Sequence, residues 1–170
     1  TITVEDGGVL MIDDHLLNNG KIIVKNGGTV IVNEGGYIMA YDQNAGGTIS
    51  LDGGNLIILD SAKVICDQGK GSVDAKNGAT ILNRGMLMVG NKLILNNNSC
   101  LTNEADAMLL VGGRIDRERG GVGAFAFDEI VSRLDTEMFT YLISNTSKIV
   151  NKGAINEPPE WYTDYSDGAK

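Results

Sequence analysis

The chain has 170 residues, of which 42% are hydrophobic and 21% are charged, and these values suit one globular domain with a buried core. Its net charge of −8 and sequence pI of about 4.5 argue against the basic surface that nucleic acids and anionic membranes attract. No stretch approaches the roughly 18 apolar residues of a membrane-spanning helix. We therefore expect neither a nucleic-acid partner nor insertion into a membrane.

Glycine, proline and cysteine usage narrows the fold class. The chain contains 23 Gly but only 2 Pro, and only 5% of its residues are aromatic. Glycine supplies the positive-φ positions of tight turns, so this composition favours many short strands joined by such turns. The two cysteines, Cys66 and Cys100, lie within apolar runs, and we expect both to be buried free thiols rather than a disulfide framework.

Short apolar runs recur along the chain from Val9 to Val111 at a nearly constant spacing. Each run is too short for a helix and is rich in β-forming residues. Turns rich in Gly, Asn and Asp separate the runs, as at Gly27-Gly28 and Gly35-Gly36. The predicted strands are 9–12, 21–24, 29–32, 37–40, 48–51, 56–59, 63–66, 72–75, 79–82, 86–89, 92–95, 99–101 and 108–111.

A longer self-similarity suggests how these strands are arranged. The segment Leu17–Val24 matches the segment Leu82–Val89 much further along the chain. If the shift between them covers three coils, each coil has roughly 22 residues and three strands, which is typical of a solenoid. In this arrangement we expect Ile31 to lie in the core.

Three other architectures fit less well. An antiparallel sandwich should alternate polar and apolar residues, whereas these runs are apolar at nearly every position. Runs that are apolar at every position fit a three-faced coil only where other residues cover the outer surface of one of its faces. A left-handed β-helix needs a six-residue period, and a calcium-binding β-roll needs an Asp where Gly120–Phe125 has Phe.

The pattern Leu-Asn-x-Gly followed by four apolar residues, at Leu17 and Leu82, resembles coils of pectin-lyase-like right-handed parallel β-helices. More narrowly, it is similar to the repeats of filamentous-haemagglutinin-type adhesins and autotransporter passengers. The resemblance covers residues 2–113 and implies an all-β, right-handed parallel β-helix of about five coils. It also implies a secreted or cell-surface protein of bacterial or phage origin, with a cytoplasmic location left open.

We expect a single domain with four parts. These are a β-solenoid (1–113), a Gly-rich joint (114–127), a capping α-helix (128–145), and a short strand followed by an acidic aromatic tail (146–170).

The predicted C-terminal helix rests on a four-residue spacing. Ile130, Leu134, Met138 and Leu142 would form one apolar stripe, and Asp128 would cap the N-terminus. The stripe would seal the last coil or dock a partner. Beyond it, we expect a strand at residues 148–150.

Candidate binding residues are aromatic. Trp161, Tyr162 and Tyr165 lie among carboxylates in the tail, and Tyr41 follows a predicted strand. Such side chains stack on sugar rings or anchor a protein contact, although those in the tail could equally fold back over the helix.

Candidate catalytic or metal-binding residues are few. Asp52 and Asp74 are separated by one predicted coil length, so they could stack in adjacent coils as a carboxylate pair suited to calcium, although both lie beside turns where Asp is common. His15 is the sole histidine, and one His with two separated Cys makes no zinc site. We assign no catalytic residue and expect no cofactor, with calcium the one weak alternative.

These observations favour a non-catalytic structural or adhesive module that binds a protein or glycan partner. Two alternatives stay open: a carbohydrate-active β-helix of the lyase or hydrolase type, and an acidic soluble antagonist of the immunity-protein type. The sequence leaves the oligomeric state undetermined.

Overall fold

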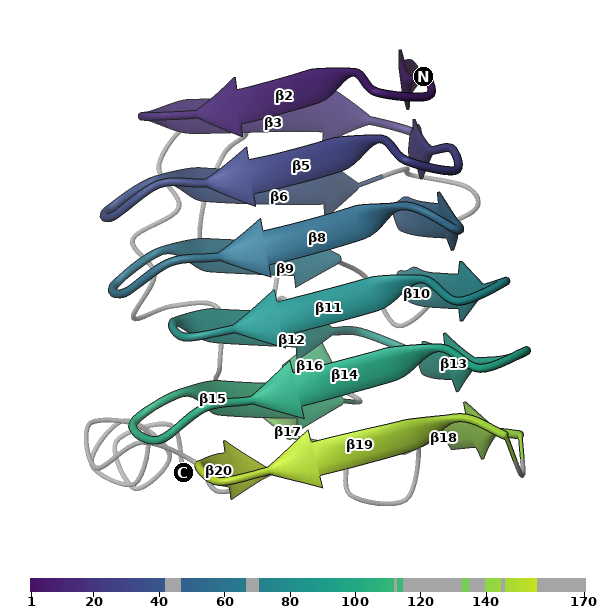
Figure 1. Ribbon diagram of the computed structural model, residues 1–170. Helices are drawn as coiled ribbons and strands as arrows, with labels where there is room; N and C mark the ends of the chain where they lie inside the picture. The colour runs from purple at the N-terminus through teal and green to yellow at the C-terminus, as the bar shows by residue number, and fades with distance from the viewer. Residues whose placement is uncertain are drawn as a thin grey trace.

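The structure is a computed structural model that describes residues 1–41, 47–66, 71–111, 113–114, 133–134, 140–144 and 146–155. For residues 113–114, 133–134 and 140–143, only the backbone is described. The described chain is an all-β parallel solenoid with three sheets of six strands each (Figure 1). The predicted fold class is therefore confirmed.

Each sheet contains every third strand of the solenoid. Sheet A consists of β1 (Ile2–Val4), β4 (Lys21–Val24), β7 (Thr48–Asp52), β10 (Ser72–Lys76), β13 (Lys92–Leu95) and β18 (Thr140–Ile143). Sheet B consists of β2 (Val9–Ile12), β5 (Thr29–Val32), β8 (Asn55–Ile58), β11 (Thr80–Asn83), β14 (Cys100–Asn103) and β19 (Lys148–Asn151). Sheet C consists of β3 (His15–Asn19), β6 (Tyr37–Tyr41), β9 (Lys63–Cys66), β12 (Met86–Val89), β15 (Met108–Val111) and β20 (Ala154–Ile155).

The chain completes about four turns between β1 and β13, and β13, β14 and β15 form the fifth level of strands. In Figure 1 it crosses the front through β2 and returns behind through β3 while descending from the N-terminus, which is a right-handed winding. Strands β18, β19 and β20 add a sixth level. Before that level, β16 (Gly113–Arg114) pairs antiparallel with β17 (Arg133–Leu134).

The coils differ in length. Ile2 pairs with Ile22, and Ile22 pairs with Ile49, so the second coil is longer than the first. The match between Leu17–Val24 and Leu82–Val89 therefore does not span three whole coils. Leu17 lies in sheet C and Leu82 in sheet B, so the similarity is local and relates two different corners of the solenoid.

The core lies inside the three sheets and is built by alternate residues of the strands whose side chains are described. In β5, Val30 and Val32 are 1% and 0% exposed, whereas Ile31 is half-buried on the outer face. The prediction that Ile31 lies in the core was wrong by one residue of register. Because all three residues are apolar, the sequence of this strand does not reveal which face is inside.

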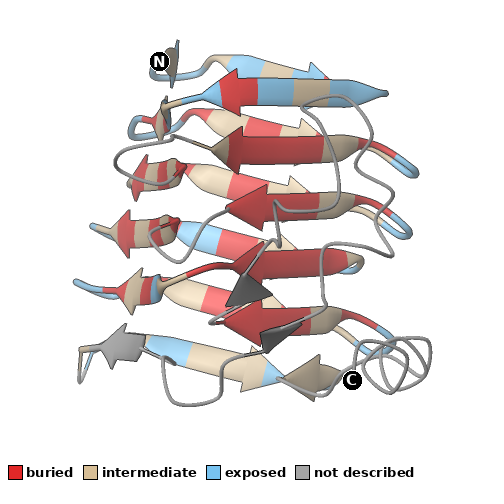
Figure 2. Cartoon of the chain, turned by 180° about the vertical axis from the view of Figure 1, so that it is seen from behind, coloured by how far each residue is buried: buried red, intermediate tan, exposed pale blue. Residues whose placement is uncertain are grey.

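Sheet C is buried on both faces over its middle strands. Its outward residues Met39, Ile65, Met88 and Leu110 are at most 1% exposed, and Met86 is 8% exposed. In Figure 2 the four strands β6, β9, β12 and β15 are coloured as buried along most of their length. A sheet buried on both faces needs apolar residues at every position, which accounts for the continuous apolar runs in these strands.

The predicted capping helix is contradicted wherever its residues are described. Thr140–Ile143 is strand β18, which pairs in parallel with β13 from Lys92↔Thr140 to Leu95↔Ile143, and Arg133–Leu134 is strand β17. Pairing with the exposed edge of β13 overrides the helical spacing that Leu134 and Leu142 suggested. Residues 128–132, 135–139 and 145 of the predicted helix lie outside the described residues. The strand predicted at 148–150 is present as β19.

Candidate functional site: the outer face of sheet B

An apolar row runs along the outer face of sheet B. Strand pairing aligns Met11, Ile31, Ile57, Leu82, Thr102 and Val150, one from each strand, and we call these six residues the apolar row. Met11 is 55% exposed, and the other five are half-buried. Only Thr102 interrupts the aliphatic surface. The row is therefore a long, partly exposed apolar strip parallel to the solenoid axis.

A polar row lies beside it, formed by the first residues of β5, β8 and β11. Asn55 donates from Nδ2 to Thr29 Oγ1 at 3.3 Å, and Thr80 Oγ1 donates to Asn55 Oδ1 at 2.7 Å. These bonds connect three consecutive coils across the surface. The polar row (Thr29, Asn55 and Thr80) is thus held in place by bonds that run along the solenoid axis.

The two rows follow from a period of two residues imposed on four-residue strands. In β5, Val30 and Val32 point inward, so Thr29 and Ile31 must point outward. The sequence did not predict this surface, because Ile31 was expected to face the core. The available signal is a polar first residue in the strands Thr29–Val32, Asn55–Ile58 and Thr80–Asn83.

The predicted aromatic residues are not brought together by the described part of the chain. Tyr41 is half-buried at the end of β6 and packs against the outer cluster of sheet C that contains Met39. Trp161, Tyr162 and Tyr165 lie outside the described residues.

Asp52 and Asp74 are not aligned. The pairing of β7 with β10 places Lys76 opposite Asp52 and Ser50 opposite Asp74, because this coil is longer than the predicted repeat. Asp52 instead accepts a hydrogen bond from Asn77 Nδ2 at 2.6 Å and forms an ion pair with Lys76 at 3.4 Å. The Asn77 hydrogen bond, together with the Lys76 cation, holds the pKa of the Asp52 carboxyl below its ordinary value, although partial desolvation opposes the shift.

His15 is exposed and lies beside Asp14, and its Nδ1 contacts the Asp14 carboxylate. Its ring also meets the ring of Tyr37 edge-on, with centroids 5.6 Å apart. The two thiols differ in environment. Cys66 is buried as predicted, whereas Cys100 is half-buried on the outer face of sheet B and its Sγ lies 3.9 Å from Thr102 Oγ1.

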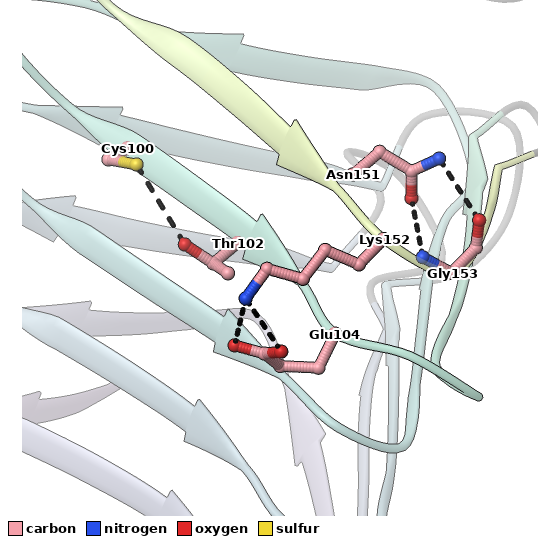
Figure 3. Close-up of polar contacts among 6 residues, drawn as sticks. All are labelled: Cys100, Thr102, Glu104, Asn151, Lys152 and Gly153. Carbon is pink, nitrogen blue, oxygen red and sulfur yellow. Dashed lines mark hydrogen bonds and ion pairs between the residues drawn. The ribbon is translucent and has the colours of Figure 1, made fainter.

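Charged residues at the turns pair between neighbouring coils. Lys152 Nζ lies 3.1 Å from Glu104 Oε2, which belongs to the preceding coil (Figure 3). Lys25 Nζ lies 2.8 Å from Glu5 Oε2 in the same way at a corner between sheets A and B. These side chains are partly exposed, so each pair contributes little to stability.

A shallow hollow of about 200 Å³ lies at the turns between sheets B and C. Its charged lining residues are Lys63, Arg84 and Asp106, and Met86 and Met108 supply apolar contacts. Because both cationic and anionic side chains line the hollow, its charge does not favour one class of ligand. Among the described residues, no group of three or more His, Cys, Asp or Glu side chains is placed to hold a metal ion.

In the part of the chain that the structure describes, no helix has the length and apolar character needed to cross a membrane. Comparisons with protein-family models, with curated proteins and with solved structures gave no match.

Proposed function

We propose that the chain is a non-catalytic interaction module of a secreted or cell-surface protein, and that it binds a protein partner through the outer face of sheet B. The observation that carries this proposal is the apolar row. Scattered apolar side chains are ordinary on a protein surface, but a contiguous strip is typical of an interaction site. Here five apolar side chains, interrupted only by Thr102, are aligned in register from Met11 to Val150.

The neighbouring polar row supports a binding role. Thr29, Asn55 and Thr80 bond to one another, so they lose little additional side-chain freedom when a partner covers them. A fixed polar border beside an apolar strip has the composition of a protein interface.

A protein partner fits this face better than a glycan does. Aromatic side chains offer the broad flat area on which a sugar ring stacks, and neither row contains one. A carbohydrate-active function has less support, because Asp52 is engaged by Lys76 and Asn77 and is not aligned with Asp74.

The experiment compares three variants with the wild-type chain in pull-downs from cell-surface protein extracts and on a glycan array. The sheet B variant carries Ile31→Lys and Ile57→Lys. The matched control carries Ile23→Lys and Ile94→Lys, which are half-buried isoleucines in β4 and β13 at outward positions of sheet A. The third variant is Trp161→Ala.

We expect one protein to be captured by the wild-type chain, by the matched control and by Trp161→Ala. The sheet B variant should lose at least about tenfold in affinity, because it buries charge in an apolar contact. Capture that survives in the sheet B variant would contradict the proposal. Glycan binding that disappears with Trp161→Ala would move the site to the tail, and shortening of a polysaccharide would indicate an enzyme.

A further inference from the structure

The turns that follow the strands of sheet B border the apolar row. In the first three coils, the second residue after the strand is a carboxylate. We call these residues the acidic column: Asp14, Glu34 and Asp60. The start of each turn is held in register, because Asn33 N donates to Ile12 O and Leu59 N donates to Val32 O. Strands β2, β5 and β8 lie one above another in Figure 1, so the carboxylates repeat once per coil.

The acidic column accompanies only one half of the apolar row. Each of its carboxylates comes three positions after the apolar-row residue of its own coil, which is Met11, Ile31 or Ile57. In the last three coils this position holds no carboxylate and is occupied by Gly85, Ala105 and Gly153. The N-terminal half of the apolar row therefore has an acidic border that the C-terminal half lacks.

The acidic column is not neutralised within the described part of the chain. Glu34 and Asp60 are exposed, and their side chains form no ion pair or hydrogen bond there. Asp14 is also exposed, and its side chain contacts the sole histidine. At the opposite edge of sheet B, by contrast, Glu5 and Asp52 each form an ion pair with a lysine of an adjacent coil. The two edges of the sheet thus differ in how their carboxylates are compensated.

Like charges in adjacent coils repel one another. Neighbouring strands are about 4.8 Å apart, which is less than the screening length of about 8 Å at physiological ionic strength. Salt therefore leaves much of the repulsion in place. The described carboxylates do not form a group of three or more that could hold a metal ion. A cationic side chain placed between two of them would offset the repulsion, so the column favours a partner that supplies lysine or arginine.

We propose that the partner docks on the first three coils of sheet B through an apolar strip that is bordered on one side by lysine or arginine side chains. Its apolar side chains cover Met11, Ile31 and Ile57, and its cations contact the acidic column. Docking of this kind rests on the binding role proposed above for sheet B, and it adds that the partner is a basic, amphipathic protein surface. The net charge of −8 would also speed the approach of such a partner.

Two labelled synthetic peptides serve as probes of this chemistry. Both form an amphipathic helix with one leucine stripe, and their remaining positions are lysine in the first peptide and glutamate in the second. Fluorescence anisotropy measures the dissociation constant of each peptide for the chain at low and at high salt. Because the two peptides share the apolar stripe, a difference between them reports on charge.

Charge-removing variants test the acidic column. The acidic-column variant is Glu34→Gln with Asp60→Asn, and both substitutions lie in exposed turns. Its matched control is Asp6→Asn with Asp74→Asn, which removes the same charge at a corner between sheets A and B and on sheet A. Circular dichroism melting confirms that each variant is folded. The acidic-column variant should melt no lower than the wild type, because it removes a repulsion.

Uncharged variants test the apolar row separately. The apolar-row variant is Ile31→Ser with Ile57→Ser, which leaves every charge in place. Its matched control is Ile23→Ser with Ile94→Ser, at half-buried outward positions of sheet A.

We expect the lysine peptide to bind the wild-type chain at least about fivefold more tightly than the glutamate peptide does. The acidic-column variant should weaken binding of the lysine peptide about five- to tenfold at low salt, as expected for the loss of two exposed ion pairs. This loss should shrink at high salt, and the matched control should change affinity less than about twofold. The apolar-row variant should weaken binding at both salt concentrations, because apolar burial does not depend on charge.

The possible failures are distinguishable. Equal losses in the acidic-column variant and its matched control would overturn the proposal, because the peptide would then respond to net charge alone. The absence of binding by the lysine peptide would also reject a basic partner. Equal affinity of the two peptides, with binding that still depends on Ile31 and Ile57, would reject the basic partner but retain docking on sheet B. Binding that is unaffected by the apolar-row variant would contradict docking on sheet B itself.

Discussion

Asn83 donates a hydrogen bond from its side-chain amide to the side-chain oxygen of Asn103 at 2.7 Å, inside the solenoid where both residues are 0% exposed. Asn103 donates in turn to Asn151 in the next coil at 2.9 Å. The same inward position of sheet B holds Ile58 in the coil before Asn83, which offers no donor, and Asn83 Oδ1 has no partner among the described residues. The ladder thus fixes the register of the three C-terminal coils, where each amide meets its equivalent.

Asn103→Ala should lower the free energy of unfolding by about 1–3 kcal/mol, because the backbone oxygen of Ala154 and the buried Asn83 amide both lose a partner. Urea unfolding followed by circular dichroism measures the change. Asn151→Ala is the control, and it should cost less because Asn151 is exposed. Equal costs for the two variants would show that burial does not strengthen the ladder.

The sequence was sufficient to predict the architecture. The sequence located strands correctly at 9–12, 21–24 and 29–32. Four-residue apolar runs between glycine-rich turns are too short for helices and are typical of strands. The register of the strands was harder to predict. Val30 points into the core and Ile31 points outward, but the two side chains are chemically alike, so the sequence does not distinguish them.

The register can be tested at these two adjacent residues. Val30→Asp should unfold the chain, because it places an unpaired carboxylate at a position that is 1% exposed, and the cost approaches the whole stability of a domain. Ile31→Asp should change the unfolding free energy by less than about 1 kcal/mol, as expected for a surface substitution. Thermal melting distinguishes the two variants, and the reverse order would place Ile31 in the core.

The candidate site and the C-terminal coil could not be predicted from the sequence, for two different reasons. Aligning Ile31 with Ile57 requires the length of each coil, and the coils are unequal, as the pairs Ile2↔Ile22 and Ile22↔Ile49 show. Thr140–Ile143 was predicted as helix because Leu142 fits an apolar spacing of four. Its strand conformation depends on pairing with β13, which lies far earlier in the chain and leaves no local signal.

Gly35 and Gly36 occupy one turn but are needed for different reasons. Gly35 has φ of +73°, and a Cβ there would meet no atom within 4 Å. A Cβ on Gly36 would lie 2.5 Å from the backbone oxygen of Ile12 in the coil above and 2.8 Å from that of Asn33. Gly35→Ala should therefore cost about 1 kcal/mol of backbone strain, and Gly36→Ala should cost more because two coils must separate. Chemical denaturation measures both, and a larger effect at Gly35 would mean that strain dominates over packing in this turn.

Asp52 should make the stability of the solenoid depend on pH at the acid end. Because the Asn77 hydrogen bond and the Lys76 cation hold the pKa of Asp52 below its ordinary value of 3.8, the folded state binds the proton more weakly than the unfolded state does. The resulting stabilisation is fully present above pH 3.8 and is lost as the pH falls through the lower folded-state pKa. Asp52→Asn should therefore melt below the wild type at neutral pH, and the gap should close on acidification.

Asp74→Asn is the matched control for that measurement, since Asp74 lies opposite Ser50 on the same sheet and not opposite a cation. Melting temperatures of the wild type and both variants, recorded by circular dichroism from neutral pH to strongly acidic pH, give the comparison. A constant gap between the wild type and Asp52→Asn across this range would mean that Asp52 stabilises the turn by its shape rather than its charge. A gap that closes for Asp52→Asn alone would show that the Asp52 charge, held by Asn77 and Lys76, stabilises this corner of the solenoid.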